Sequence, residues 1–264
     1  MNTNFWDVIT FIGLMFFCSC AAQKTNIMQK RNYSTGIEEG ERVVVVLNTF
    51  HAYDKSIESE GEEEALGNCM SKGMMKTNRS LRMVAAKDFR RTVFANKKFE
   101  DSPRSSKVLL SFLSGPSTQS QVTELGLRYI IIVSVTTRES EARSHAEAGG
   151  SGGSGICVFG REWTKYYSMS ADVLDVKYLR ESGSIRASSS GTAGCGFFTG
   201  VLGGSGYCLP VPPVPFYFSQ RTEAEGCSSL GAAVMDFIKG GDESVPALPP
   251  DDLGWVPYRP QKAP

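Results

Sequence analysis

The feature that most restricts the fold is a run of four valines and a leucine at residues 43–47. A β-branched run of this kind favours a strand, and because it contains no polar position, both faces of that strand must be covered. Burial on two sides is typical of a central strand in a sheet that carries helices on both faces. The run therefore predicts an α/β protein built around one sheet.

The other sequence patterns supply helices and strands around this run. Helical spacing of apolar residues predicts helices near 60–76, 102–114, 118–126 and 222–240. Strands are expected near 81–85, 129–135, 166–178 and 184–190. Ser102 and Pro103 are typical of a helix start, and Gly240 with Gly241 of a helix end. We expect one α/β (α+β) domain over residues 42–240, with a single mixed β-sheet, flanking helices, a Gly-rich hairpin and a Gly/Pro-rich loop.

In the strand expected at 166–178, the alternation of apolar residues changes phase between Val173 and Leu174. Either a bulge or burial of both faces at that end accounts for such a change. A turn is expected just after it, at residues 181–183, because Glu-Ser-Gly separates the two apolar runs.

The first residues have the pattern of an export leader. An apolar run over residues 8–17 is followed by Cys18, Ser19 and Cys20, and it is shorter than the roughly 20 apolar residues that a membrane-spanning helix needs. We expect a signal peptide at 1–19. No Lys or Arg precedes the run, so an uncleaved N-terminal anchor stays open as an alternative. Both interpretations place the domain at a membrane surface.

Residues 17–20, Phe-Cys-Ser-Cys, resemble the bacterial lipobox, in which a large apolar residue and then a small one precede an acceptor cysteine. The resemblance implies a lipoprotein that carries palmitate at Cys20 and is held at the cell envelope, on the outer membrane facing the periplasm. Residues 20–41 are polar and predict a flexible tether. The proline-rich residues 241–264 predict an extended tail.

Charge and motif content exclude several function classes. Lys plus Arg equals Asp plus Glu at 28 each, so no basic excess predicts a nucleic-acid partner. His51 and His145 are expected on separate loops and match no zinc-binding spacing, so no metal and no cofactor is predicted. Ser151 lies in a G-x-S-x-G string, but glycines surround it where a nucleophile elbow needs a strand and a helix. We expect no enzyme, and a serine hydrolase is the least favoured function.

Five cysteines remain in the domain if Cys20 carries lipid and Cys18 is removed with the leader. An oxidising compartment permits disulfides among them. Cys195 and Cys208 flank a Gly-rich segment and form our candidate disulfide. Cys69 and Cys227 fall at apolar positions of predicted helices, so we interpret them as small buried residues. The odd count leaves at least one free thiol.

Residues 187–220 contain no charged side chain. Their many glycines and prolines exclude a membrane-spanning helix of the ordinary kind. The aromatic residues of this stretch are candidates for partner binding: Phe197, Phe198, Phe216, Tyr217 and Phe218. Two interpretations stay open, namely an apolar loop that contacts a partner or lipid, and a cover over the domain's own core.

The order of these parts resembles that of the curli-secretion lipoprotein family and its relatives, which include lipoprotein activators of peptidoglycan synthases. The matching parts span roughly residues 42–240 and are the strands at 42–47 and 129–135, the Gly-rich hairpin at 148–160, the strand pair at 173–179 and 181–187, and the helix at 222–240. For the secretion branch of this family, the resemblance implies a membrane pore. Each subunit would contribute two hairpins to that pore.

The nearest candidates for these hairpins are residues 140–161 and 187–220. The face of the first that would meet lipid holds only Ser and Ala, which are weakly apolar, and prolines interrupt strand pairing in the second. We therefore predict a non-catalytic, membrane-anchored envelope lipoprotein that acts as an interaction or assembly module, with an envelope protein or another copy as its partner. A subunit of an oligomeric outer-membrane secretion channel is the alternative.

Overall fold

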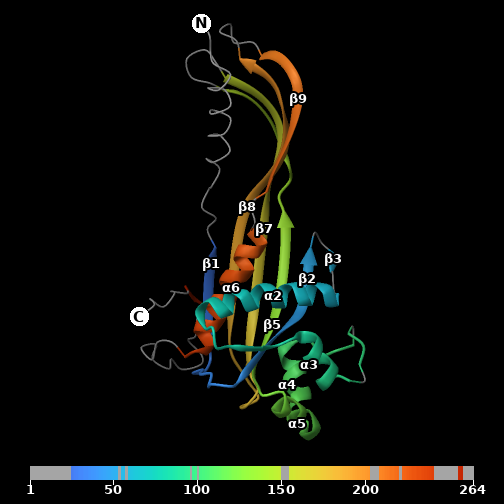
Figure 1. The fold of residues 1–264 in the computed structure, drawn as a ribbon, viewed down its shortest axis with the longest axis vertical. Coiled ribbons are helices and arrows are strands. Elements are labelled where there is room, and N and C mark those ends of the chain that lie inside the picture. The colour runs from blue at the N-terminus through green and yellow to red at the C-terminus, as the bar shows by residue number, and fades with distance from the viewer. Residues whose placement is uncertain are drawn as a thin grey trace.

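The computed structural model describes residues 25–52, 55–56, 59–95, 97–99, 101–149, 155–202, 208–219, 222–240 and 255–257. The predicted leader, the lipidation site Cys20, Ser151 and most of the predicted tail lie outside these residues. The molecule is elongated: helices surround one end of a long sheet, and strands continue well beyond them at the other end (Figure 1).

One mixed sheet organises the described part of the chain, in the order β10-β1-β8-β7-β5-β2-β3, with β4 beside β2, β6 beside β7 and β9 beside β8. Its strands are β1 Asn26–Arg31, β2 Arg42–Ala52, β3 Lys55–Ser56, β4 Arg82–Val84, β5 Leu127–Glu139, β6 Arg143–Gly149, β7 Gly155–Asp175, β8 Arg180–Leu202, β9 Cys208–Ser219 and β10 Val256–Pro257. Strands β4 and β5 run parallel to β2, and the other pairs are antiparallel. The predicted fold class is confirmed.

The strand predicted from the valine run is buried on both faces, as expected. Val43, Val45 and Leu47 belong to a core under helices α2 (Glu60–Thr77) and α6 (Thr222–Ile238). Val44 and Val46 belong to a second core on the opposite face. Strand β5 alternates in the same way, because successive residues of a strand point to opposite faces. The run therefore lies between two helical layers.

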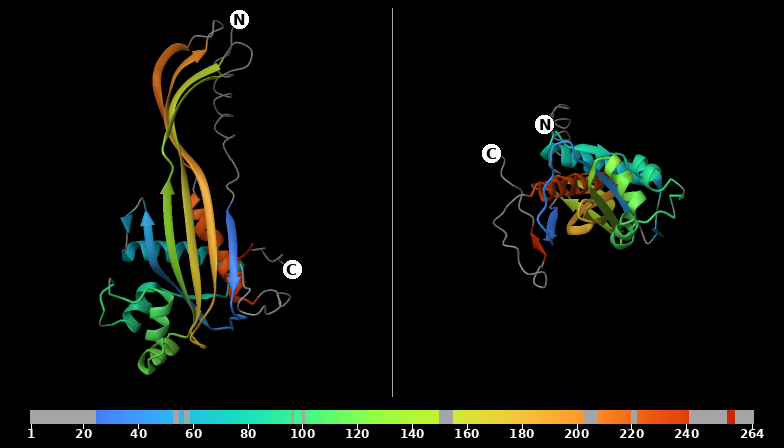
Figure 2. Two further views of the ribbon diagram at one scale, coloured as in Figure 1. Left: turned by 180° about the vertical axis from the view of Figure 1, so that it is seen from behind. Right: turned by 90° about the horizontal axis from the view of Figure 1, so that it is seen from below.

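The second core packs under three short helices: α3 Ala86–Val93, α4 Ser106–Leu113 and α5 Pro116–Glu124. These helices gather at the end of the molecule away from the long strands (Figures 1 and 2). The predicted start of α4 at Ser102 is wrong, since Ser105 is its N-cap residue. Ser102 instead donates a hydrogen bond from its hydroxyl to the carbonyl of Lys98, at 3.0 Å, and so belongs to the preceding turn.

The change of apolar phase in β7 comes from burial of both faces. Val173 lies in the core under α6, and Leu174 in the core under α3–α5. The pairing of β7 with β5 is continuous through these residues, whereas the neighbouring β8 holds Ser182 as an extra residue between Glu181 and Gly183. The predicted turn at 181–183 is wrong, because the chain turns at residues 176–179 and β8 has already begun at Arg180.

The segment predicted as a tether is part of the domain. Strand β1 pairs with β8 through Arg31 opposite Gly183, and Arg31 donates a hydrogen bond to the carbonyl of Phe237, at 2.9 Å, near the end of α6. A cation is favourable there because helix carbonyls carry partial negative charge. Residues 256–257 of the predicted tail also form a strand, β10, against β1. The free edge of β8 below β9 supplies the backbone partners that these polar residues need.

Helices α2 and α6 are linked by a disulfide between Cys69 and Cys227, whose Cα atoms lie 6.0 Å apart. Our interpretation of these two cysteines as unlinked apolar residues is therefore wrong. Each is followed four residues later by a glycine, Gly73 or Gly231, at which an added Cβ would lie 2.1–2.3 Å from a backbone oxygen of the other helix. The two Cys-x-x-x-Gly segments let the helices approach closely enough for the cysteines to meet.

Candidate functional site

Two adjacent hairpins form the part of the sheet that continues beyond the helices. Strand β6 pairs with residues 156–162 of β7, and β9 pairs with residues 193–202 of β8. The two hairpins lie side by side because β7 pairs with β8 along its whole length. We call these four paired segments the projecting sheet. Gly226, near the start of α6, lies against Tyr167 and Ser189, and the strands continue beyond the helix (Figure 1).

The uncharged stretch 187–220 supplies most of one hairpin. We expected a loop, because four prolines lie at 210, 212, 213 and 215, but residues 208–219 form strand β9. Among the described residues β9 pairs with β8 alone, so it lies at an edge of the sheet. An edge strand tolerates prolines because its outward backbone groups need no partner within the sheet.

The predicted partner-binding aromatic residues come together in this hairpin. Phe197 lies opposite Pro215 and Phe198 opposite Val214, while Phe216, Tyr217 and Phe218 pair with the segment 194–196 of β8. Strand pairing therefore places the backbone positions of these five residues in one hairpin.

The predicted disulfide between Cys195 and Cys208 does not form. Cys195 lies opposite Tyr217, and Cys208 lies opposite Leu202, near the far end of the same ladder. Seven positions of β8 separate Cys195 from Leu202, and a strand rises about 3.3 Å per residue, so the two cysteines are far outside disulfide reach. Cys195 is a free, exposed thiol.

Both outer edges of the projecting sheet carry features that oppose pairing with another strand. The β9 edge contains prolines, which have no backbone N–H. The β6 edge has Arg143, His145 and Glu147 at alternate positions. Prolines and charges are the usual means by which sheets protect their edges. Neither outer edge is therefore suited to pairing with a further strand.

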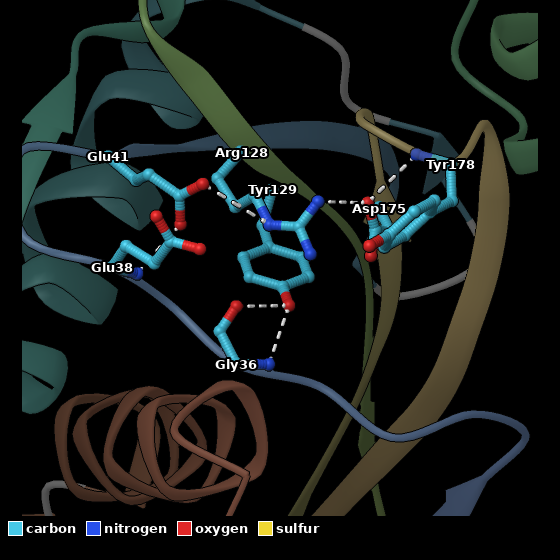
Figure 3. A network of polar contacts seen from close by, with 7 residues as sticks. All are labelled: Gly36, Glu38, Glu41, Arg128, Tyr129, Asp175 and Tyr178. Atoms are coloured by element: carbon cyan, nitrogen blue, oxygen red, sulfur yellow. Dashed lines mark hydrogen bonds and ion pairs between the residues drawn. The ribbon is translucent and has the colours of Figure 1, made fainter.

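We call the end of the sheet that carries the helices the base. A buried polar network lies in the base, where β5 begins and β7 ends (Figure 3). Arg128 of β5 donates a hydrogen bond to Asp175 of β7 at 2.6 Å and forms an ion pair with Glu41 at 3.5 Å. Asp175 is fully buried. Removing one residue of such a pair would leave the other charge buried without a partner, which is strongly destabilising.

The neighbouring Tyr129 ties the chain before β2 to the same base. Its hydroxyl donates to the carbonyl of Gly36 at 2.7 Å and accepts from the Gly36 N–H at 3.0 Å (Figure 3). Burial raises the pKa of Tyr129, and the hydrogen bond with the Gly36 backbone lowers it in part. The phenol therefore stays neutral and holds this segment against β5.

The two histidines do not form a site. His51 lies in β2 opposite Thr136, and His145 lies in β6 opposite Gly160, so our placement of both on loops is wrong. Within the described residues, no group of three His, Cys, Asp or Glu side chains is placed to hold a metal ion. No helix among those residues is both long and apolar enough to cross a membrane.

The sequence analysis missed a polar face on the lower half of the sheet. In β8, Ile185 and Ala187 are buried under α6 while Arg186, Ser188 and Ser190 are exposed on the other face. Alternation of apolar and hydroxyl residues over 184–190 was a signal for this face. We recognised the strand there but not the surface that its outer residues form.

No family model matches this chain, and no curated protein sequence matches it. A PelC dodecamer from Paraburkholderia phytofirmans is 10% identical over 83% of this chain and 100% of that chain, with a TM-score of 0.35. A neuraminyllactose-binding hemagglutinin homolog from Helicobacter pylori is 10% identical over 78% of this chain and 88% of that chain, with a TM-score of 0.29. Similarity at this level carries no functional argument for the chain.

Proposed function

We propose that this protein is a non-catalytic envelope lipoprotein that works as an assembly module, and that a face of its projecting sheet contacts another copy or an envelope protein. One observation carries the proposal: an uncharged, aromatic-rich hairpin extends beyond the helical layers that cover the rest of the sheet. Contiguous uncharged surface of this kind is a common feature of interaction sites.

The composition of this hairpin supports binding over chemistry. Residues 187–220 contain no Asp, Glu, Lys, Arg or His, and these are the residue types that most often act as acids, bases or charge stabilisers. Aromatic side chains, by contrast, commonly dominate the binding energy of interfaces. Lipidation at Cys20 completes the proposal, because it would hold the module at the outer membrane.

The test is the double substitution Phe197→Ala with Phe198→Ala. We expect the variant to unfold at nearly the parent temperature but to lose its association, measured as molar mass in mild detergent and as co-purification of cross-linked envelope proteins. If the two rings instead packed in the domain's own core, truncation would cost roughly 3–5 kcal/mol for each. Strong destabilisation with unchanged association would contradict the proposal.

Two control variants make this experiment interpretable. Phe89→Ala removes a ring that is fully buried under α3–α5, so it should lower stability and serve as the core reference. Tyr178→Ala removes an exposed ring at the opposite end of the sheet, so it should leave association unchanged. Equal effects of Tyr178→Ala and the double variant on association would argue against a specific contact through the projecting sheet.

A secretion-channel subunit is the second candidate function. The observation that favours it is the presence of two neighbouring hairpins, one of which pairs β8 with β9 from Ala193 to Leu202. That length suits the roughly 9–11 residues with which a tilted strand crosses a bilayer. Ring-shaped particles in detergent together with ion conductance in planar bilayers would favour the channel, and a monomer without conductance would exclude it.

A further inference from the structure

A groove of about 830 Å³ lies on the sheet, beside the ends of β1 and β5. Every residue that lines it has a polar side chain, and most of these side chains carry a hydroxyl. Binding sites for small molecules are usually rich in apolar side chains with a few polar ones. The side chains of this groove are all of polar types, so the groove suits a ligand that carries several hydrogen-bonding groups.

Strand pairing arranges these residues in two rows across the sheet. In the first row Thr136 of β5, Ser168 of β7 and Ser188 of β8 lie opposite one another, and Asn26 of β1 extends the row. Cross-strand partners lie on the same face of a sheet, about 4.5–5.5 Å apart. The row therefore presents a series of three hydroxyls and an amide at regular spacing.

The second row adds a ring and a charge. Arg138 of β5 lies opposite Tyr166 of β7, and Tyr166 lies opposite Ser190 of β8. Tyr166 is 51% exposed, which is high for a tyrosine in the middle of a sheet. Its neighbour Tyr167 is buried under α6 on the other face. The exposed ring thus lies beside the row of hydroxyls, where a ligand can stack on it.

Within the described residues, the side chains of these two rows have no hydrogen bond or ion pair with one another or with the rest of the domain. Their hydrogen-bonding capacity is therefore available to a ligand. Below them, Arg186 stacks on Trp255 at 4.1 Å from the ring centre and continues the same polar face. Among the residues that the structure describes, no carboxylate lines the groove, so these residues offer no anionic partner to a metal ion or a cationic ligand.

We propose that this groove binds a saccharide that bears a carboxylate. Saccharides combine many hydroxyls with flat, weakly positive C–H faces, and the negative face of an exposed Tyr166 ring suits such a surface. Serine and threonine hydroxyls can donate and accept, as sugar hydroxyls do. The Arg138 guanidinium would pair with the carboxylate in a charge-assisted, two-point hydrogen bond. These residues lie outside the segments that form the projecting sheet, and the proposal does not rest on the assembly function.

Isothermal titration calorimetry on the detergent-solubilised full chain tests this proposal with two defined probes. A hyaluronan hexasaccharide carries carboxylates, and hexa-N-acetylchitohexaose is a neutral chain of related sugars. We expect saturable binding of the hyaluronan probe, at least tenfold weaker binding after Tyr166→Ala, and at least tenfold weaker binding after Arg138→Gln. The N-acetylated chito-oligosaccharide should bind more weakly than hyaluronan, and Arg138→Gln should leave its binding unchanged.

A matched control separates a site from general charge attraction. Lys165→Gln removes a cation from the residue next to Tyr166 in the sequence. Lys165 forms an ion pair with Glu139, its cross-strand partner, and both side chains lie on the face of the sheet opposite the groove. This variant should bind the hyaluronan probe like the parent. The proposal is overturned if neither probe binds, if both bind equally, or if Lys165→Gln weakens binding as much as Arg138→Gln.

Discussion

At the scale of single residues, two glycines decide how closely α2 and α6 approach. A Cβ at Gly73 would lie 2.1 Å from the carbonyl oxygen of Ser228, and one at Gly231 would lie 2.3 Å from that of Met70. Both obstacles are backbone atoms, which cannot rotate away as a side chain does. The helices can pack at this distance only where neither carries a side chain.

The first prediction compares two glycines of the same helix. Gly73→Ala should lower the free energy of unfolding by about 1–3 kcal/mol or more, because it forces the two helices apart. Gly67→Ala has no atom within 4 Å of the added Cβ, so it should raise stability by up to about 1 kcal/mol through helix propensity. Urea denaturation of both variants measures the difference, and equal effects would refute the close contact.

The carboxyl group of Glu181 lies where its charged form is unfavourable. Burial raises its pKa, and the nearby Asp172 raises it further, while a hydrogen bond from Ser184 and the charges of Lys30 and Lys107 lower it in part. Ser184 lies between the two acids, since its hydroxyl donates to Asp172 at 2.8 Å and lies 3.3 Å from Glu181. The folded state therefore holds the Glu181 proton more tightly than the unfolded chain does.

The second prediction concerns pH. A raised pKa in the folded state means that stability is complete below the unfolded pKa and falls as pH rises through the folded pKa. Glu181→Gln removes this loss, so its stability relative to the parent should increase between pH 4 and pH 7. Thermal unfolding across this range measures the change. Glu124→Gln, at the exposed end of α5, is the control and should leave the pH profile unaltered.

At the scale of elements, a covalent link joins one helix near the start of the chain to one near its end. The disulfide between Cys69 and Cys227 spans 158 residues of sequence. It encloses all of β4 to β9, including both hairpins of the projecting sheet. Cys69 also lines a groove with Lys72 and Lys76.

The third prediction follows from this link. Replacing Cys69 and Cys227 together by alanine should lower the free energy of unfolding by about 2–4 kcal/mol, because a disulfide that closes a long loop restricts the unfolded chain. Cys195→Ala removes a free, exposed thiol and should leave stability unchanged. Peptide mapping under non-reducing conditions checks the pairing, and a cross-link from Cys195 to Cys208 would contradict the structure.

At the scale of the whole molecule, the helices and the long hairpins occupy opposite ends (Figure 2). The base has two cores, one on each face of the sheet, and it also contains the buried ion pair between Arg128 and Asp175. The projecting sheet depends on strand pairing between neighbours. This division separates the part that stabilises the fold from the part that we propose makes contacts.

The fourth prediction concerns the proposed attachment of this molecule to the envelope. Cys20→Ala should release the protein from the membrane fraction or leave an unprocessed precursor, because acyl chains on that cysteine would hold it there. Membrane fractionation and the gel mobility of pulse-labelled protein measure both outcomes. Cys18→Ala is the matched control, two residues earlier in the leader. If Cys20→Ala fractionates and migrates like the parent, lipidation at Cys20 is wrong.

Much of the base could be predicted because its evidence is local. The valine run, the helical spacing over 60–77 and the glycine at 240 each depend on a few adjacent residues, and Gly240 does adopt φ +76° beyond the end of α6. The candidate site was predicted only in part. The prolines at 210–215 indicated a loop where the structure has strand β9, since an edge position is not visible in one sequence.

Sequence alone thus determined that the segment 43–47 is buried on both faces, because the polarity pattern of a strand records its own surroundings. The tertiary structure decided which distant segments meet: β1 with β8, Cys69 with Cys227, and Thr136 with Ser168 and Ser188 in one polar row. These pairings are set by strand order and helix approach. Strand order and helix approach depend in turn on how all the helices and strands pack together into the two cores. No single segment of the sequence contains that information.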